Sequence, residues 1–553
     1  MSNTKWTFDL RLVVDATGLQ SQSRLRGIGR YTRGLISGLA RTGEGHELWL
    51  VLSASRSESR DEILDTFRGL IPEDRIVFYH SFDKVSYQKE ENIWRRKASE
   101  LVRDHLIASL EPDVLLFSSL IEGFGDDILT SSSTLLADTV RVGVAYDLIP
   151  LMDPEAYLGG DAVLAWYHEK IGHIRTCDGL LAISASAGQE FVDLLGIDAR
   201  RITKVPPAAD GFAEMDTDDS KFPELASRLN ITAPYFTYAA SYEGRKNFDD
   251  LMAAFAEFQR PETTRYQLVL ITSNATPVAV AVRTITDQLG LDPSDVILTG
   301  QVSDEELKLL YSNCVAMVYP SRHEGFGLPA LEAMHCDVPV IGSNASSIPE
   351  VIGLADAMFN PCSTADIAAH IWRVATDEAY RDALIDNGRT RRDLFSWDKS
   401  GEKAWRAFEA LLAERAPPSR RNSRELYRDL IAQIKAVPFA GDPPGTDEWH
   451  HLANYISENL DIIDSIPPAA PPERRSWRIE GPFDSTYSLA LLNRETVRAL
   501  ADAGEHVLLH SSEGPGDYHP DEAFLEAAHR DVLKIWQDSA REAGVRPDVV
   551  SRN

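Results

Sequence analysis

The sequence predicts an α/β protein built from two parallel-sheet domains in series. Short apolar stretches alternate with amphipathic ones from residue 8 to about residue 215, beginning with the stretch FDLRLVVD. After the polar stretch AEMDTDDSKFPE, the alternation starts again and continues to about residue 395. Buried strands separated by helices are typical of parallel sheets that are covered on both faces. We therefore expect two Rossmann-like domains, with a ligand cleft between the carboxyl ends of their sheets.

The first domain is assigned to residues 1–215. Its first strand, at residues 8–15, is followed by an amphipathic helix with the sequence YTRGLISGLAR at residues 31–41. Later apolar stretches predict four more strands, at residues 47–52, 113–117, 141–146 and 179–183.

The second domain is assigned to residues 216–395. Five apolar stretches predict its strands, at residues 235–239, 266–271, 296–299, 316–319 and 338–341. A helix is expected at residues 304–313, because Ser303 can cap it and Glu306 can complete a capping box. Residues 396–415 predict a terminal helix that closes the two-domain unit.

The remainder of the chain differs in composition. At residues 416–476 the segments APPSRRNSR and IPPAAPPERR flank a helical stretch, which predicts a Pro-rich linker with helices. Residues 477–553 then repeat the strand, loop, helix and strand order of residues 8–52. We interpret them as the start of a second module that is truncated, with a small C-terminal cap as the alternative.

Composition excludes several classes of protein. The 553 residues include 56 basic and 85 acidic side chains, a formal charge of −29, which argues against nucleic acid as a partner. The four cysteines form no C-x-x-C pair, so a zinc ribbon or redox motif has no support. No apolar leader and no apolar window of about 18 residues is visible, and we expect a cytoplasmic protein.

A glycine-containing loop, SQSRLRGIGRY, follows the first predicted strand. Gly27 and Gly29 let the backbone come close to a ligand, and the helix N-terminus behind them favours an anion. Arg26 and Arg30 add positive charge. The loop is not a dinucleotide fingerprint, because Thr32 stands where the third glycine would be. A plain turn remains the alternative.

The segment PSRHEGFGLPALEAMHC, at residues 320–336, is the most informative in the chain. It follows a buried strand, and its two glycines open a loop before a helix that begins near a proline. Glu324 in the loop and Glu332 one turn into the helix are expected to face one cleft. Three backbone amides are candidates for binding the same ligand: those of Phe326, Gly327 and Leu328. Carboxylates beside such amides suit a hydroxylated ligand such as a sugar, whereas a solvated glutamate pair is the alternative.

Arg245 and Lys246, in the sequence SYEGRKN, follow the first strand of the second domain. Two adjacent cations at the carboxyl end of a sheet suit a diphosphate, because arginine offers a fork and lysine a point charge. We expect Lys246 to be exposed in the cleft. A surface charge pair is the alternative interpretation.

These motifs in combination resemble the retaining glycosyltransferases of family four, which have the GT-B fold. The resemblance rests on EGFGLPALEAM, on RKN upstream and on PVIGSNASSIPEV downstream, and it covers roughly residues 8–412. The segments SRLRGIGRY, SSLIEGFGDD, YDLIPLMDPEAYL and LAISASAGQEF are similar to those of bacterial multi-module transferases that build O-antigen, including the polymannose mannosyltransferases. GPFDSTYSLALLNRE resembles the opening of a second transferase module in those proteins.

The resemblance implies roles for the candidate residues. Glu324 would hold hydroxyls of the donor sugar and Glu332 those of the ribose. Arg245 and Lys246 would neutralise the leaving diphosphate, which Gly29 would approach from the first, acceptor-side domain. The family's E-x7-E signature matches the two glutamates.

One position departs from the family pattern. Many members have a histidine at the end of the D-L-x-P strand, whereas this sequence has Tyr146 followed by Asp147. The histidine role is therefore not transferred, and Asp147 is kept as a catalytic candidate. His323 is interpreted as an ordinary satisfied histidine.

The implied function is transfer of a sugar, with mannose from GDP-mannose favoured, onto a growing O-antigen in α-linkage. No D-x-D motif stands at a convincing strand end, so we expect no metal and no cofactor besides the nucleotide-sugar substrate. The acceptor would be an oligosaccharide or lipid-linked glycan, with a membrane-associated assembly partner and a peripheral place at the inner membrane. Alternatives are another donor (GDP-rhamnose, a UDP- or dTDP-sugar), an epimerase or phosphorylase, and a non-catalytic glycan-binding module.

Overall fold

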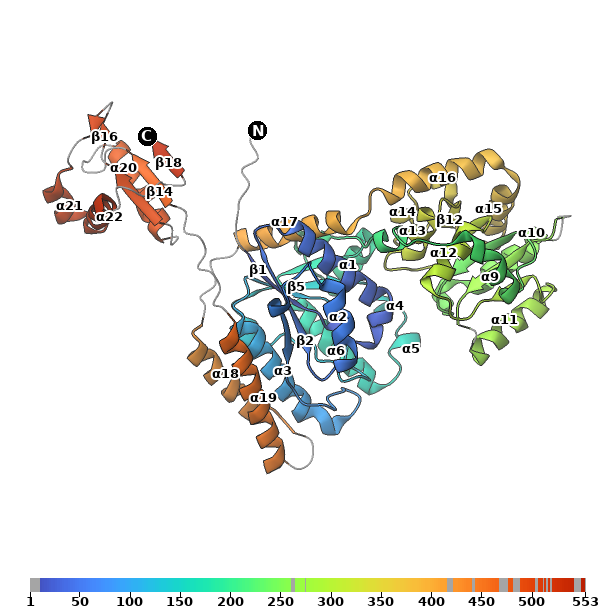
Figure 1. The fold of residues 1–553 in the computed structure, drawn as a ribbon, viewed down its shortest axis with the longest axis horizontal. Helices are drawn as coiled ribbons and strands as arrows, with labels where there is room; N and C mark the ends of the chain where they lie inside the picture. The colour runs from blue at the N-terminus through green and yellow to red at the C-terminus, as the bar shows by residue number, and fades with distance from the viewer. Residues whose placement is uncertain are drawn as a thin grey trace. The chain divides into compact units, whose positions relative to one another are not determined.

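The computed structural model describes residues 10–552 except 260–263, 274, 415–420, 440–442, 467–475, 481–487, 503–505, 511, 514–515, 518–519 and 542–548 (Figure 1). It separates into two compact units. The larger spans Leu10–Pro468 and the smaller includes Ala469–Asn553.

A seven-stranded parallel sheet forms the first half of the larger unit, in the order β3-β2-β1-β4-β5-β6-β7. Its strands are β1 (Arg11–Asp15), β2 (Glu47–Ser53), β3 (Ile76–Tyr79), β4 (Val114–Phe117), β5 (Val140–Ala145), β6 (Gly179–Ala182) and β7 (Ile202–Lys204). All five predicted strands are confirmed. The two edge strands, β3 and β7, were not predicted from the sequence.

The second half of the unit is a six-stranded parallel sheet, in the order β10-β9-β8-β11-β12-β13. Its strands are β8 (Tyr235–Ala239), β9 (Gln267–Ile271), β10 (Val296–Leu298), β11 (Ala316–Tyr319), β12 (Val340–Ser343) and β13 (Met358–Phe359). The predicted helix is α12 (Asp304–Ser312), and the expected capping box joins Ser303 and Glu306. Two parallel sheets with helices between their strands confirm the predicted α/β class.

Helix α17 (Trp397–Ala413) leaves the second half of the unit and packs against α1 (Gly27–Thr42) of the first. Glycines permit this close approach. A Cβ on Gly34 would lie 2.0 Å from the Trp397 ring, and one on Gly38 would lie 2.1 Å from the Trp397 carbonyl oxygen. The backbone N–H of Trp397 donates to Asp210 at 2.7 Å. Larger side chains at these glycines would therefore force the helices apart.

The helices predicted within a linker are α18 (Ser423–Ala436) and α19 (Thr446–Ser465), and both pack against α3 (Ile93–Ser109) (Figure 1). Leu426, Leu430 and Ile434 are buried in the core of the first sheet domain. Their spacing of four residues gives α18 one apolar face, which explains why it docks. These helices extend the first domain, and in this respect they differ from the linker that we expected.

Polar contacts fix the same helices. Arg421 pairs with Asp138 at 2.7 Å and with Asp429 at 3.0 Å. The Asn459 amide accepts from the backbone N–H of His80 at 2.8 Å and donates to its carbonyl at 2.9 Å. The side chain of Asn459 thus satisfies the backbone of the chain where it leaves edge strand β3.

The smaller unit contains a three-stranded parallel sheet in the order β15-β14-β18. Its elements are β14 (Ser476–Glu480), α20 (Ser488–Asp502), β15 (His506–His510), α21 (Glu522–Ala528), α22 (Arg530–Arg541) and β18 (Val549–Arg552); β16 (Ser512–Glu513) and β17 (Gly516–Asp517) form a separate pair. β14 lies between its neighbours as β1 lies between β2 and β4. The predicted strand, helix and strand are confirmed, whereas the turn at residues 481–487 lies outside the described residues.

Two general expectations concern membranes and disulfides. Among the residues that the structure describes, no helix combines the length and the apolar character needed to cross a bilayer. Cys177, Cys314, Cys336 and Cys362 are all free thiols. Burial raises the pKa of Cys177, which suits a buried apolar role rather than a reactive thiolate.

We expect Leu430→Ala to destabilise the protein by about 2–5 kcal/mol, because the side chain is fully buried beneath α3. The measurement is urea unfolding followed by circular dichroism. Arg428→Ala, on the exposed face of the same helix, is the matched control and should change the free energy of unfolding by less than about 0.5 kcal/mol. Equal, small effects in both variants would contradict the docking of α18.

Candidate active site

The loop between β11 and α13 (Leu328–His335) presents the central candidate residues. Gly327 has φ +119°, a conformation that L side chains rarely adopt, and a Cβ there would come within 3.3 Å of the Tyr319 ring. A proline occupies the first turn of α13, as expected. Glu324 and Glu332 are both buried, which is unusual for glutamates without partners.

Glu324 is held by both predicted cations. The Lys246 Nζ donates to its two carboxylate oxygens at 2.7 and 2.8 Å, and Arg245 Nη1 donates to one of them at 3.1 Å. Burial raises the pKa of Glu324, but the charges of Lys246 and Arg245 outweigh it, so that the pKa is lowered overall. Glu324 is therefore ionised at neutral pH and accepts hydrogen bonds.

Lys246 is buried, with 9% of its surface exposed, so the expectation of an exposed cleft lysine is wrong. It ends the short turn η9 (Gly244–Lys246), and Asn247 follows in the left-handed conformation at φ +60°. The Asn247 amide donates to the carbonyls of Pro320 and Pro361 at 3.1 and 2.7 Å. These two hydrogen bonds of Asn247 fix the turn next to the loop that carries Glu324. A lysine can be buried there because its charge is paired with Glu324.

Arg245 lies between several acceptors. Its Nε donates to Glu243 at 3.0 Å, and its Nη1 also donates to the His323 carbonyl at 3.0 Å. Tyr157, on α5 (Pro154–Tyr157) of the first sheet domain, donates to Glu243 at 3.1 Å. The structure thus brings the predicted cations together with Glu324 and links them to the first domain.

Glu332 contacts a different cation. Arg30 of α1 donates to it at 2.8 Å and to Asp304 of α12 at 2.7 Å. Burial raises the pKa of Glu332, Arg30 lowers it and Asp304 raises it, with a raised pKa as the result. The two glutamates of the motif therefore have separate partners. The sequence pattern identifies Arg30 only as a source of positive charge, because it cannot connect positions so far apart as Arg30 and Glu332.

Tyr146 occupies the position where the family pattern has histidine, and it points into the first domain. Its hydroxyl donates to the Ser118 carbonyl at 2.9 Å, and its ring meets Tyr31 edge-on at 5.5 Å between centroids. Asp147 lies beside the loop, because a Cβ on Gly325 would come within 3.0 Å of its Oδ2. Burial and the nearby Glu190 raise the pKa of Asp147.

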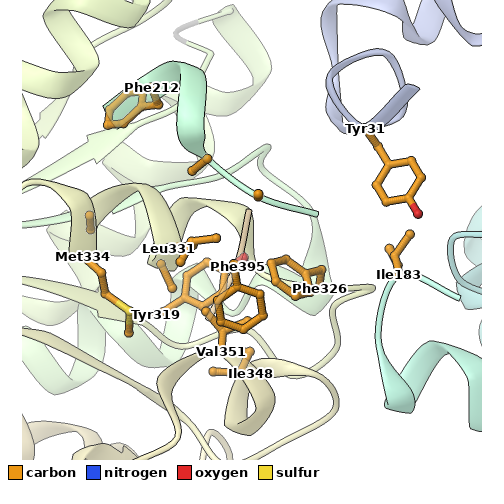
Figure 2. Packing of buried hydrophobic residues seen from close by; sticks show 14 of the residues in the cluster. Tyr31, Ile183, Phe212, Tyr319, Phe326, Leu331, Met334, Ile348, Val351 and Phe395 are labelled. Atoms are coloured by element: carbon orange, nitrogen blue, oxygen red, sulfur yellow. The ribbon is translucent and has the colours of Figure 1, made fainter. Parts of the chain in front are cut away.

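The remaining predicted residues have structural partners of their own. Phe326 is buried and its ring meets Phe395 edge-on at 5.5 Å between centroids, in the apolar cluster drawn in Figure 2. Leu328 is half-buried at the start of α13. Ser347 donates to the carbonyls of Glu324 and Phe326 at 2.9 and 2.7 Å, which fixes the loop backbone.

Gly29 is required by its own loop. A Cβ there would lie 1.9 Å from the Arg24 carbonyl oxygen, so the glycine lets α1 begin against the preceding turn. This close approach agrees with the alternative interpretation of the loop as a plain turn. Binding of a diphosphate at Gly29 stays a prediction.

The sequence reading did not select Glu122, a buried carboxyl in the loop after β4. It accepts from the Ser119 hydroxyl at 3.1 Å. Burial and Asp126 raise its pKa to about 7, against the lowering effect of hydrogen bonds from three serines. The segment SSLIEGFGDD gave the only signal, a cluster of acidic residues behind a strand.

No metal site is visible in the part of the chain that the structure describes, where no three His, Cys, Asp or Glu side chains are grouped to hold an ion. Metal independence stays a prediction.

Comparison with known families identifies the second sheet domain. Residues 223–391 match the family described as "Glycosyl transferases group 1". This part of the chain is a glycosyltransferase group 1 domain. The matched range contains Arg245, Lys246, Glu324 and Glu332, which form the arrangement described above.

Relatives extend the similarity to the first domain. The chain is 31% identical over 408 residues to the "Serotype-specific mannosyltransferase WbdA" of Escherichia coli, covering 73% of this chain and 48% of that protein. It is 31% identical over 234 residues to the "O-antigen chain mannosyltransferase B" of Escherichia coli, covering 42% of this chain and 60% of that protein. The chain thus spans about half the length of the relative that it matches over the longer range.

The fold is shared with solved structures. The Anabaena protein Alr3699/HepE in complex with UDP and glucose aligns over 72% of this chain and 100% of its own, with a TM-score of 0.52 and 16% identity. At this identity the likeness concerns the fold alone. Together with the two parallel sheets, it confirms the predicted GT-B fold of the glycosyltransferase group 1 domain and its partner domain.

We expect Glu122→Gln to remove a pH dependence of stability near neutrality. A carboxyl whose pKa is raised to about 7 in the folded protein stabilises it fully below about pH 4.5, and this contribution is lost as the pH rises to about 7. The difference amounts to roughly 3 kcal/mol. Urea unfolding at pH 5 and pH 8 measures this difference. Relative to the parent, the glutamine variant should have a higher free energy of unfolding at pH 8 than at pH 5. A parallel pH dependence in both proteins would contradict the raised pKa.

Proposed function

We propose that this protein is a retaining glycosyltransferase that moves mannose from GDP-mannose onto a growing O-antigen in α-linkage. The observation that carries the proposal is the convergence of Arg245 and Lys246 on Glu324 beside the loop of a glycosyltransferase group 1 domain. The choice of mannose and O-antigen is supported by the names of the related proteins.

On the donor side, Arg245 and Lys246 would bind the diphosphate. Both cations are already positioned by Glu324, so a phosphate oxygen can replace part of their contact without moving them far. Amides at the start of α13 (Phe326, Gly327 and Leu328) would add hydrogen-bond donors, and Gly29 would approach from the first domain. Glu332 would accept from the ribose hydroxyls, sharing its carboxylate with Arg30.

In the transfer step, the bond between the sugar carbon and the diphosphate oxygen breaks while the acceptor oxygen bonds to the same carbon from the same face. The leaving phosphate takes the acceptor proton, so no protein base is required. Arg245 and Lys246 stabilise the charge that develops on the phosphate. Glu324, ionised and fixed, accepts hydrogen bonds from the donor sugar.

Asp147 would contact the sugar rather than attack it. A retaining glycosidase uses an ionised carboxylate as its nucleophile, about 5 Å from the acid. Burial and the nearby Glu190 raise the pKa of Asp147, and its carboxyl can exchange hydrogen bonds with sugar hydroxyls. Its place beside Gly325 puts it at the loop that carries Glu324.

The acceptor would be an oligosaccharide or a lipid-linked glycan, reached in the cytoplasm at the inner membrane with a membrane-associated partner. The first sheet domain would bind it, and the smaller unit would belong to a second transferase module. These assignments extend the names of the relatives to this chain. The alternative is a glycan-binding module without activity, and calorimetric titration with GDP distinguishes the two, because only the transferase needs a nucleotide site.

The direct test is a screen of GDP-, UDP- and dTDP-sugars with a mannose oligosaccharide acceptor, read by mass spectrometry. We expect one added hexose with GDP-mannose. The same rate is expected in excess EDTA, because the cations and the helix N-terminus supply the charge that a metal would supply. Loss of activity in EDTA that magnesium or manganese restores would contradict metal independence, and no product with any donor would contradict the function.

Lys246→Met should reduce transfer at saturating donor by more than about tenfold, because it removes charge from the phosphate site at nearly constant volume. The variant should also be less stable, because the buried carboxylate of Glu324 then loses its ion pair with Lys246 and retains the one with Arg245. Arg322→Ala is the control: this half-exposed cation lies two residues from Glu324 and pairs with Asp250 at 2.7 Å. If both variants turn over at the parent rate, Lys246 does not act on the diphosphate.

A further inference from the structure

Helix α7 (Ala185–Leu195) of the first sheet domain holds the loop that carries Glu324. Ser184, its N-cap, donates to the Gly325 carbonyl at 2.7 Å. Glu350 of the second domain accepts from the backbone N–H groups of Ala185 and Ser186 at 2.9 and 2.7 Å. These contacts attach the beginning of α7 to the second domain.

Farther along α7, Glu190 connects two segments of the site. Its Oε1 lies 2.8 Å from Nε2 of His323, the residue directly before Glu324. Its Oε2 accepts from the backbone N–H of Leu148 at 2.8 Å, directly after Asp147. Glu190 is 91% buried, and its hydrogen bond with Leu148 is shielded from water. One carboxylate therefore sets the loop of the second domain against a strand end of the first.

His323 has charged and polar neighbours on several elements. The hydrogen bond to Glu190 raises its pKa, burial lowers it, Asp147 raises it and Arg245 lowers it, and the net effect is a raised pKa. The backbone carbonyl of His323 also accepts from Arg245 at 3.0 Å. His323 is thus joined directly to Glu324 along the chain, whereas Arg245 is also held by Glu243 and Glu324.

Tyr167 lies on α6 (Asp161–Arg175). We refer to the contact between Glu190 and His323 as the bridge. The side chain of Tyr167 is 99% buried, and its hydroxyl has no hydrogen-bond partner among the described residues. Burial raises the pKa of Tyr167, and the charges of Asp147 and Glu190 raise it further. A buried hydroxyl without a partner is costly unless a ligand or water satisfies it.

We infer that Glu190 and His323 are positioning residues for sugar transfer. They hold the Glu324 loop against the Asp147 strand end, in the geometry that the reacting sugar requires. This inference rests on the proposed function. Nucleotide binding uses Arg245, Lys246 and Glu332 and does not need the bridge, so the two residues should affect turnover and leave nucleotide affinity intact.

The test compares Glu190→Ala, His323→Ala and the double variant with the parent, using GDP-mannose and an oligosaccharide acceptor. Each single variant should lower kcat at least about tenfold, because misplacement of reacting groups by about 1 Å can cost a hundredfold. The double variant should stay within about twofold of the singles, since both remove one interaction. GDP affinity by calorimetry should change less than about threefold. His168→Gln, an exposed histidine, is the matched control and should behave as the parent.

A rescue variant and a pH profile distinguish this role from general stabilisation. The amide of His323→Gln can donate to Glu190 as the imidazole does, so kcat should recover toward the parent. In the parent, kcat should fall as the pH rises through the raised pKa of His323, because the charge-assisted hydrogen bond weakens. His323→Gln should lack this alkaline decline. Its folding is expected to be normal, so this comparison stands even where an alanine variant unfolds.

Opposite results overturn the inference. They are parent-like kcat in both alanine variants, losses that multiply in the double variant, or an alkaline decline that persists in His323→Gln. Absence of transfer by the parent protein would instead count against the proposed function, because every comparison above takes parent turnover as its reference.

Discussion

The buried ion pair between Glu324 and its two cations is the interaction on which the site depends. An isolated carboxylate with 6% of its surface exposed would be protonated or strongly destabilising. Lys246 and Arg245 offset that cost and lower its pKa. Glu324 also joins two segments: it holds Arg245 and Lys246, which follow β8, against the loop after β11. The charge balance of the site therefore exists before any ligand binds, and a diphosphate bound as we propose would meet charges that are already in position.

The close packing of the two sheet domains also constrains the geometry of the site. Gly34 and Gly38 let α17 lie against α1, and Gly325 leaves room for Asp147. Polar groups then cross between the domains at Arg30, Tyr157 and Glu190. These contacts surround the loop that carries Glu324, so the position of one domain decides the geometry of a site made largely by the other.

The docked helices α18 and α19 show how composition can mislead. Proline-rich flanks suggest a spacer, but the apolar face of α18 lies beneath α3 in the core of the first domain. A four-residue spacing of leucine and isoleucine was present in the sequence and predicts such a surface. Its partner could not be read from the pattern, because Arg421 and Asp138 are 283 positions apart.

The sequence by itself determined the alternation of strands and helices, the capping of α12 and the strand, glycine loop and helix around Glu324. These features are local: a period of two or four residues, a cap or a glycine with a required backbone conformation depends on neighbouring positions. Tertiary structure decided which side chains meet. It paired Glu332 with Arg30, His323 with Glu190, and Tyr146 with the backbone of Ser118. It also raised the pKa of Glu122 to about 7, since burial and a neighbouring carboxyl exist only after the chain has folded.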